Sequence, residues 1–124
     1  MKLVLVVLIA LMLLPPQVRA SDYKQLYDRQ VETNKAMVAT DAMILLWFKN
    51  HPDYKKYSSI KTRVLNLYKI LEQAKTAHEK SIEFSKKGDF EKAYQWAKKE
   101  WGFLNDIAVK GKKIQENYKE LEAE

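Results

Sequence analysis

The chain has 124 residues, of which 31% are charged and 47% hydrophobic, and it contains no cysteine. Disulfide bonds and lipid attachment through a cysteine are therefore excluded, so packing alone must hold the fold. The formal net charge of +6 at pH 7 is compatible with attraction to an anionic surface, but it gives no reason to expect a nucleic-acid partner.

The first twenty residues have the layout of a secretory signal. Lys2 supplies the initial charge, an unbroken apolar run extends over Leu3–Leu14, and Ala20 supplies the small residue before the cut. The run is too short for a bilayer, which takes about 20 apolar residues to span. We therefore expect residues 1–20 to be a cleaved signal peptide. Residues 21–124 would then be one exported domain of net charge +4, periplasmic or extracellular, with no transmembrane segment.

Two interior sites carry strong helix-breaking chemistry, Asn50–Asp53 and Gly88-Asp89, and they divide the domain into three segments. Pro52 suits the first turn of a helix, Gly88 suits a helix end that needs positive φ, and Asp89 can cap the next helix. Apolar residues recur every three or four positions in each segment, and nothing alternates as a strand would. The sequence predicts three helices, over residues 22–50, 53–87 and 90–122.

Short connections favour antiparallel neighbours, so we expect an all-α fold, an elongated antiparallel three-helix bundle that runs up-down-up. The third segment has a second apolar strip, formed by Trp96, Phe103 and Ile107. This strip indicates contact with two helices and is also the reason to consider self-association. Gly102 and Gly111 each cost about 1 kcal/mol relative to alanine inside a helix, so a break or bend near either is an alternative to a continuous third helix.

Two polar residues, Asn34 and Asp41, interrupt the apolar stripe of the first helix. A buried carboxylate must be paired or neutralised, so we expect Asp41 to meet a lysine, a histidine such as His78, or water. This buried polar seam of Asn34, Asp41 and His78 either fixes the register of the helices or forms a polar pocket for a ligand.

No residue pattern indicates metal binding or catalysis. His51 and His78, the only histidines, have no ligand-type partner at the spacing of helical metal sites, so we interpret them as a turn residue and a core-edge residue. Carboxylates such as Glu100 and Asp106 are predicted on solvated faces. With no phosphate-binding loop and no nucleophile elbow, the sequence predicts no enzyme activity, no cofactor and no metal.

Aromatic residues cluster at both turns, with lysines beside them. One interpretation is that these rings close the ends of the bundle. The other is that some of them are partly exposed and form a patch for a partner, bordered by basic side chains. The candidate partner-binding residues are Tyr54, Tyr57, Trp96 and Phe103, with Lys98 and Lys99 as the basic rim.

The second turn carries a recognisable motif, Gly88-Asp89-Phe90-Glu91-Lys92-Ala93, preceded by Phe84 and followed by Ala97. It resembles one tetratricopeptide turn, present in a single copy. Together with Ala74 and Ala77 it is similar to small bacterial envelope proteins of unknown function, in which a single helical hairpin turns on a Gly-Asp-aromatic-Glu-Lys-Ala motif. The resemblance covers residues 70–101 and implies an envelope location and a hairpin, but no activity.

These features predict a non-enzymatic envelope protein whose helical rod binds another envelope protein, or a second copy of itself, by helix docking. The alternative is a small cationic chaperone-like protein or a binder of anionic surfaces, whose contacts would weaken in salt. A third hypothesis is a small-molecule binder around Asn34 and Asp41, which its ligand would stabilise.

Overall fold

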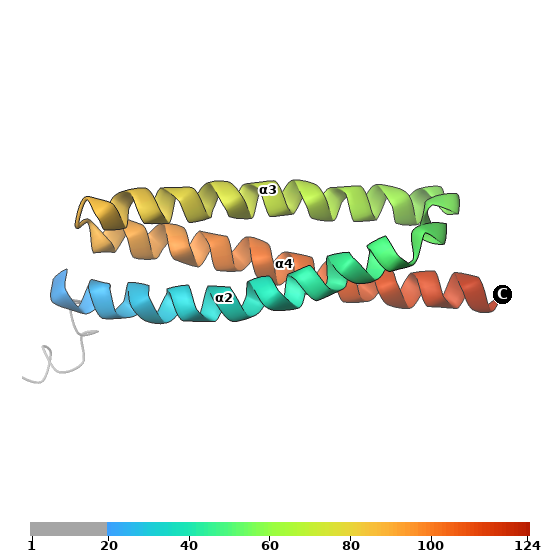
Figure 1. The fold of residues 1–124 in the computed structure, drawn as a ribbon, viewed down its shortest axis with the longest axis horizontal. Helices are drawn as coiled ribbons and strands as arrows, with labels where there is room; N and C mark the ends of the chain where they lie inside the picture. The colour runs from blue at the N-terminus through green and yellow to red at the C-terminus, as the bar shows by residue number, and fades with distance from the viewer. Residues whose placement is uncertain (1–19) are drawn as a thin grey trace, which may run out of the picture.

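A computed structural model describes residues 20–124; the expected signal peptide lies almost wholly outside this part of the chain. Three long helices occur, α2 (Ala20–Asn50), α3 (Ser58–Lys86) and α4 (Phe90–Ala123), and a short 3-10 helix, η1 (Pro52–Lys56), joins the first two (Figure 1). The described residues contain no strand, which confirms the all-α prediction. None of these helices is sufficiently long and apolar to span a bilayer.

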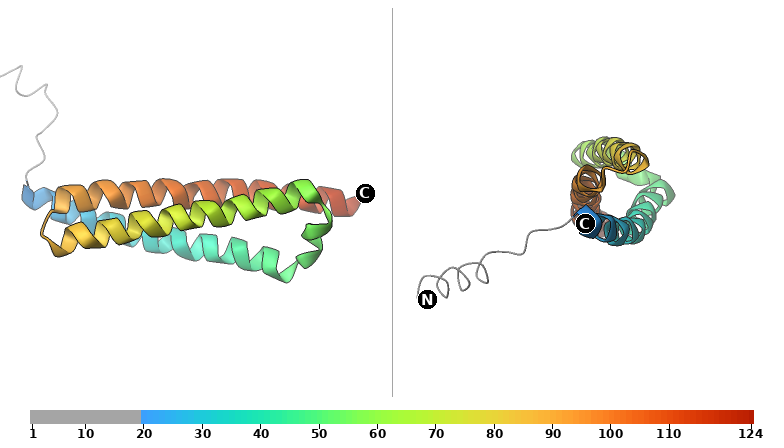
Figure 2. Two further views of the ribbon diagram at one scale, coloured as in Figure 1. Left: turned by 90° about the horizontal axis from the view of Figure 1, so that it is seen from above. Right: turned by 90° about the vertical axis from the view of Figure 1, so that its left-hand side faces the viewer.

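The three helices run antiparallel in chain order along one common axis, so the predicted elongated up-down-up bundle is confirmed (Figure 1). The helix α4 packs against both α2 and α3. In contrast, the backbones of α2 and α3 hardly approach each other, and the end-on view shows the three helices at the corners of a triangle (Figure 2). The second apolar strip of the third segment indicated contact with two helices, and α4 does pack against two.

The second helix begins later than predicted. Pro52 does start a helical turn, but that turn is the 3-10 helix η1, and α3 starts only at Ser58. Between them Tyr57 is extended, with φ −99° and ψ 105°. The ring of Tyr57 lies 6.0 Å from that of Tyr118, so packing against the core accounts for the interruption.

The second turn is formed as expected. Gly88 has φ +77°, in the left-handed region that favours glycine, and ends the turn after α3. Asp89 then caps α4, since its Oδ1 accepts a hydrogen bond from the backbone N–H of Lys92 at 3.2 Å.

The helix α4 continues through both interior glycines, so the alternative of a break at Gly102 or Gly111 is wrong. Gly111 is buried, and a Cβ atom at this position would lie 2.5 Å from Cγ2 of Ile44. The absence of a side chain at Gly111 is therefore what lets α2 approach α4 this closely.

The apolar core has two parts. The larger, around Phe48, Ile60, Leu67 and Ile114, lies towards η1, and the smaller, around Tyr27, Ala93 and Ala97, lies towards the turn between α3 and α4. Between them along α2 come the two buried polar residues that the sequence placed on the stripe. The candidate site lies at this position along the bundle, between the two apolar clusters.

Candidate functional site: a polar groove between two helices

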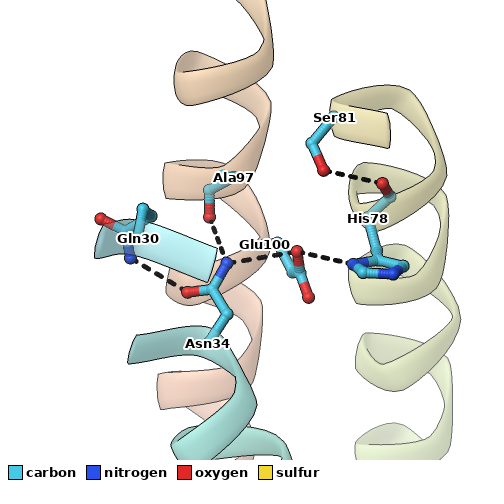
Figure 3. A network of polar contacts seen from close by, with 6 residues as sticks. All are labelled: Gln30, Asn34, His78, Ser81, Ala97 and Glu100. Atoms are coloured by element: carbon cyan, nitrogen blue, oxygen red, sulfur yellow. Dashed lines mark hydrogen bonds and ion pairs between the residues drawn. The ribbon is translucent and has the colours of Figure 1, made fainter. Parts of the chain in front are cut away.

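A buried polar network joins all three helices (Figure 3). The Nδ2 group of Asn34 on α2 donates to the carbonyl of Ala97 at 2.9 Å and to Oε1 of Glu100 at 3.2 Å, both on α4. Gln30 donates from Nε2 to Oδ1 of Asn34 at 3.0 Å. From α3, Nδ1 of His78 lies 3.1 Å from the same Oε1 of Glu100. In this pair one of the two groups donates and the other accepts, since both an imidazole and a carboxyl group can take either role.

Glu100 corrects the sequence-based prediction, which placed it on a solvated face. Only 5% of its surface is exposed. The signal was present, because Ala93, Ala97, Glu100 and Leu104 follow the spacing of one buried helix face. Glu100 therefore interrupts the apolar stripe of α4 as Asn34 and Asp41 interrupt that of α2.

His78 is bonded to a neighbour, as predicted, but that neighbour is Glu100 rather than Asp41, and the prediction that His78 lies in a buried seam is wrong. Its side chain is 53% exposed, so the ring lies at the surface end of the network. From this position His78 forms one hydrogen bond with the buried carboxylate.

Asp41 is buried, as the stripe predicted, with 2% of its surface exposed. The prediction that Asp41 meets a lysine or a histidine is wrong, because neither of its carboxylate oxygens has a hydrogen-bond partner among the described residues. Burial raises the pKa of Asp41 from 3.8 to about 7, because the interior disfavours the charged form. Asp41 is thus a second buried carboxyl, separate from the network of Asn34, Glu100 and His78.

The sparse contact between α2 and α3 leaves an open groove of about 450 Å³, which we call the α2–α3 groove. It is lined by Val31, Asn34, Lys35 and Val38 of α2, by Leu71, Ala74, Lys75, His78 and Glu79 of α3, and by Glu100 and Leu104 of α4. Its buried polar lining consists of Asn34 and Glu100, and much of the rest is aliphatic. A mostly apolar cavity with a few fixed polar groups is typical of small-molecule sites.

A second, shallower depression of about 330 Å³ lies along the seam between α3 and α4. Trp96 and Phe103 line it from α4, and Glu72, Gln73, Thr76 and Ala77 line it from α3. We call it the Trp96 surface. Both aromatic side chains are half-buried, and Nζ of Lys99 lies 4.3 Å from the centre of the Trp96 ring. The structure thus brings three of the six candidate partner-binding residues together.

The other three candidates lie elsewhere. Tyr54 and Tyr57 are at the η1 end, where both are half-buried against the larger core cluster. The ring of Tyr54 lies 5.5 Å from that of Phe48, so these rings close the end of the bundle. Lys98 lies over the ring of Tyr94, at 4.7 Å from its centre. The six candidates therefore do not form one surface.

Comparison with models of known protein families, with curated proteins and with solved structures yields no match for this chain. Within residues 20–124, no three side chains of the metal-binding types lie close enough together to hold an ion.

Proposed function

We propose that this chain is a non-enzymatic, exported envelope protein of the kind that its turn motif resembles, and that it is a protein–protein interaction module. The observation that carries the proposal is the Trp96 surface. There, two large aromatic side chains stay partly exposed around a depression on a rigid helical seam.

The chemistry of this surface suits a protein partner. Tryptophan and other aromatic side chains are enriched among the residues that dominate binding energy at interfaces. Lys99, stacked on Trp96, adds a basic border to the aromatic centre. A partner helix could place an apolar residue in the depression and an acidic residue beside Lys99, which is the helix-docking mechanism.

The alternative is a cationic chaperone-like protein or a binder of anionic surfaces. The exposed lysines Lys98 and Lys99 beside Tyr94 and Trp96 support it, since lysine next to an aromatic ring also suits an anionic polymer. Binding of this kind depends on exposed charges, which salt screens within about 10 Å at 0.1 M ionic strength. The two functions therefore differ in their response to salt.

The test is affinity capture from native cells that express the full chain with a C-terminal tag. We expect one stoichiometric partner that stays bound in high salt and is lost from Trp96→Ala. Trp101→Ala is the matched control, because Trp101 is also a partly exposed tryptophan of α4 but does not line the Trp96 surface. A broad set of proteins or polymers released by modest salt would instead support the alternative. Recovery of the chain from the envelope fraction, with Ser21 as its first residue, checks export.

A further inference from the structure

The α2–α3 groove has features that the proposed protein docking does not use. It lies between α2 and α3, whereas the Trp96 surface lies on the seam between α3 and α4, so the two sites share no lining residue. We propose that the groove binds a small organic cation with an apolar tail, such as a primary alkylamine, whose ammonium group donates to the carboxylate of Glu100.

The hydrogen bonds to this carboxylate use only one of its two oxygens. Only 5% of the surface of Glu100 is exposed. The two side chains that form hydrogen bonds with its carboxylate, those of Asn34 and His78, both approach Oε1. Figure 3 shows the other oxygen, Oε2, turned away from both of them. Among the described residues, the buried side-chain oxygens without a partner belong to Asp41 alone, so Oε2 of Glu100 is reachable from the groove. A cation that donates to Oε2 in this mostly apolar surrounding would form a charge-assisted hydrogen bond, which is stronger than a neutral one.

The two lysines that line the groove pair with other residues. Nζ of Lys35 lies 3.1 Å from Glu32, and Nζ of Lys75 lies 3.3 Å from Glu72. Each pair runs along the surface of a single helix, and both lysine side chains are well exposed. Neither lysine pairs with Glu100, so His78 is the one basic side chain among the described residues that contacts this carboxylate.

The shape of the groove beside Glu100 suits an alkyl tail. Val38, Leu71 and Leu104 supply aliphatic walls next to the polar network. Val38 follows Asn34 by four residues, as Leu104 follows Glu100, which is about 6 Å along each helix axis. A short alkyl tail can therefore lie against these walls while its ammonium group reaches Oε2. The volume of about 450 Å³ falls within the range of about 300–1,000 Å³ that is usual for small-molecule sites.

The experiment titrates the purified protein with three probes of equal chain length, octylamine, octanol and octanoate, by calorimetry below the concentrations at which they aggregate. All three offer the same apolar tail, but only the first brings a cation. A hydrogen bond to a charged group makes a larger contribution than a neutral one, so we expect octylamine to bind at least about tenfold more tightly than octanol. Octanoate should bind most weakly, because it places a second negative charge beside Glu100.

Two variants locate the binding. Glu100→Gln retains a hydrogen-bonding group for Asn34 and His78 but removes the charge, so the advantage of octylamine over octanol should disappear. Glu116→Gln is the matched control, because Glu116 is an exposed glutamate of α4 outside the groove, and this variant should bind like the wild type. Val38→Phe fills the groove from a position that is 47% exposed, so it should weaken all three probes without disturbing the core.

Equal affinity for octylamine and octanol, tighter binding of octanoate, or the absence of saturable octylamine binding would each overturn the proposal. So would an unchanged octylamine affinity in Glu100→Gln or in Val38→Phe. If Glu100→Gln is too unstable to titrate, the probe series on the wild type and Val38→Phe still decides the question. Partner capture through the Trp96 surface is independent of these results.

Discussion

The carboxyl group of Asp41 lies inside the rod, and no described side chain or backbone group bonds to it. Its pKa is raised to about 7 by burial, so the folded protein keeps this proton through the range in which the unfolded chain, with a pKa near 3.8, has lost it. The folded state then binds more protons than the unfolded state. The free energy of unfolding therefore falls as the pH rises from about 4 to about 7, and this contribution is constant outside that window.

Asp41→Asn should remove this effect, because the amide does not ionise. At about pH 8 the free energy of unfolding of the variant should exceed that of the wild type by about 4 kcal/mol, and near pH 4 the two free energies should be similar. Denaturant unfolding of both proteins at a series of pH values measures the difference between their free energies of unfolding. Other titrating groups contribute equally to both proteins, so their contributions cancel in this difference. A difference that does not change with pH would show that Asp41 titrates normally in the folded protein.

Glu100, the other buried carboxyl, differs from Asp41 in its contacts. Asp41 has no hydrogen-bond partner among the described residues, whereas Glu100 forms hydrogen bonds with both Asn34 and His78. Only Glu100 lines the α2–α3 groove. Of the two buried carboxyls, Glu100 is thus the one a ligand can reach, and Asp41 is the one that affects stability alone.

Among the elements, α4 determines the architecture, since both other helices pack on it. Its two interior glycines differ in what surrounds them. Gly102 is exposed and has open space where a Cβ would be, whereas Gly111 is buried against Ile44. The two glycines therefore separate helix propensity from close packing.

Gly102→Ala should stabilise the protein by about 1 kcal/mol, because alanine favours the helix and contacts nothing. Gly111→Ala gains the same helix propensity, but the new Cβ would lie 2.5 Å from Cγ2, the methyl group on the β-branch of the buried Ile44. Overpacking of this kind costs about 1–3 kcal/mol, so we expect a net loss of stability. Thermal unfolding of the two variants compares them directly.

A third variant checks the cause of that loss. Ile44→Leu moves the branch away from Cβ and removes Cγ2, so adding it to Gly111→Ala should recover part of the lost stability. If Gly111→Ala is as stable as Gly102→Ala, or if Ile44→Leu gives no recovery, the contact with Ile44 does not limit the approach of α2 to α4.

The helices and the second turn could be predicted from the sequence because their signals are local. The three-and-four repeat, Gly88 and Asp89 act within a few residues. The start of α3 could not, because Pro52 is compatible with the first turn of either a 3-10 helix or an α-helix. The structure has a 3-10 turn there, followed by the extended Tyr57, whose ring packs near that of Tyr118. Tertiary contacts such as this one are not visible in a local pattern.

The polar network was predicted only in part, for a related reason. The sequence placed Asn34 on a buried stripe, but the partners of a buried group depend on how each helix is rotated about its axis. That rotation turns Glu100 towards Asn34 and His78 and leaves Asp41 without a partner among the described residues. The polar pocket offered as an alternative was located in part, because Asn34 and His78 line the groove and Asp41 does not. The aliphatic walls of the groove could not be predicted, because they result from the separation of α2 from α3.

At the scale of the whole molecule, the shape follows from helix length. The helix α4 has 34 residues, which at 1.5 Å per residue gives a rod about 50 Å long. Three helices in contact make that rod roughly 20 Å wide. A uniform rod of these dimensions has a radius of gyration of about 16 Å, whereas a compact globular domain of about 100 residues has one of about 13 Å.

The same architecture bears on self-association. Ile107, part of the strip that suggested it, is completely buried, and Trp96 and Phe103 are half-buried along the seam with α3. Because α3 already occupies much of that strip, we expect the protein to stay monomeric at high micromolar concentration. Small-angle scattering with light scattering should then give the mass of one chain together with a radius of gyration near 16 Å. A doubled mass would show that the remaining exposed part of the Trp96 surface is enough to pair two copies, and Trp96→Ala should then restore the monomer while Trp101→Ala should not.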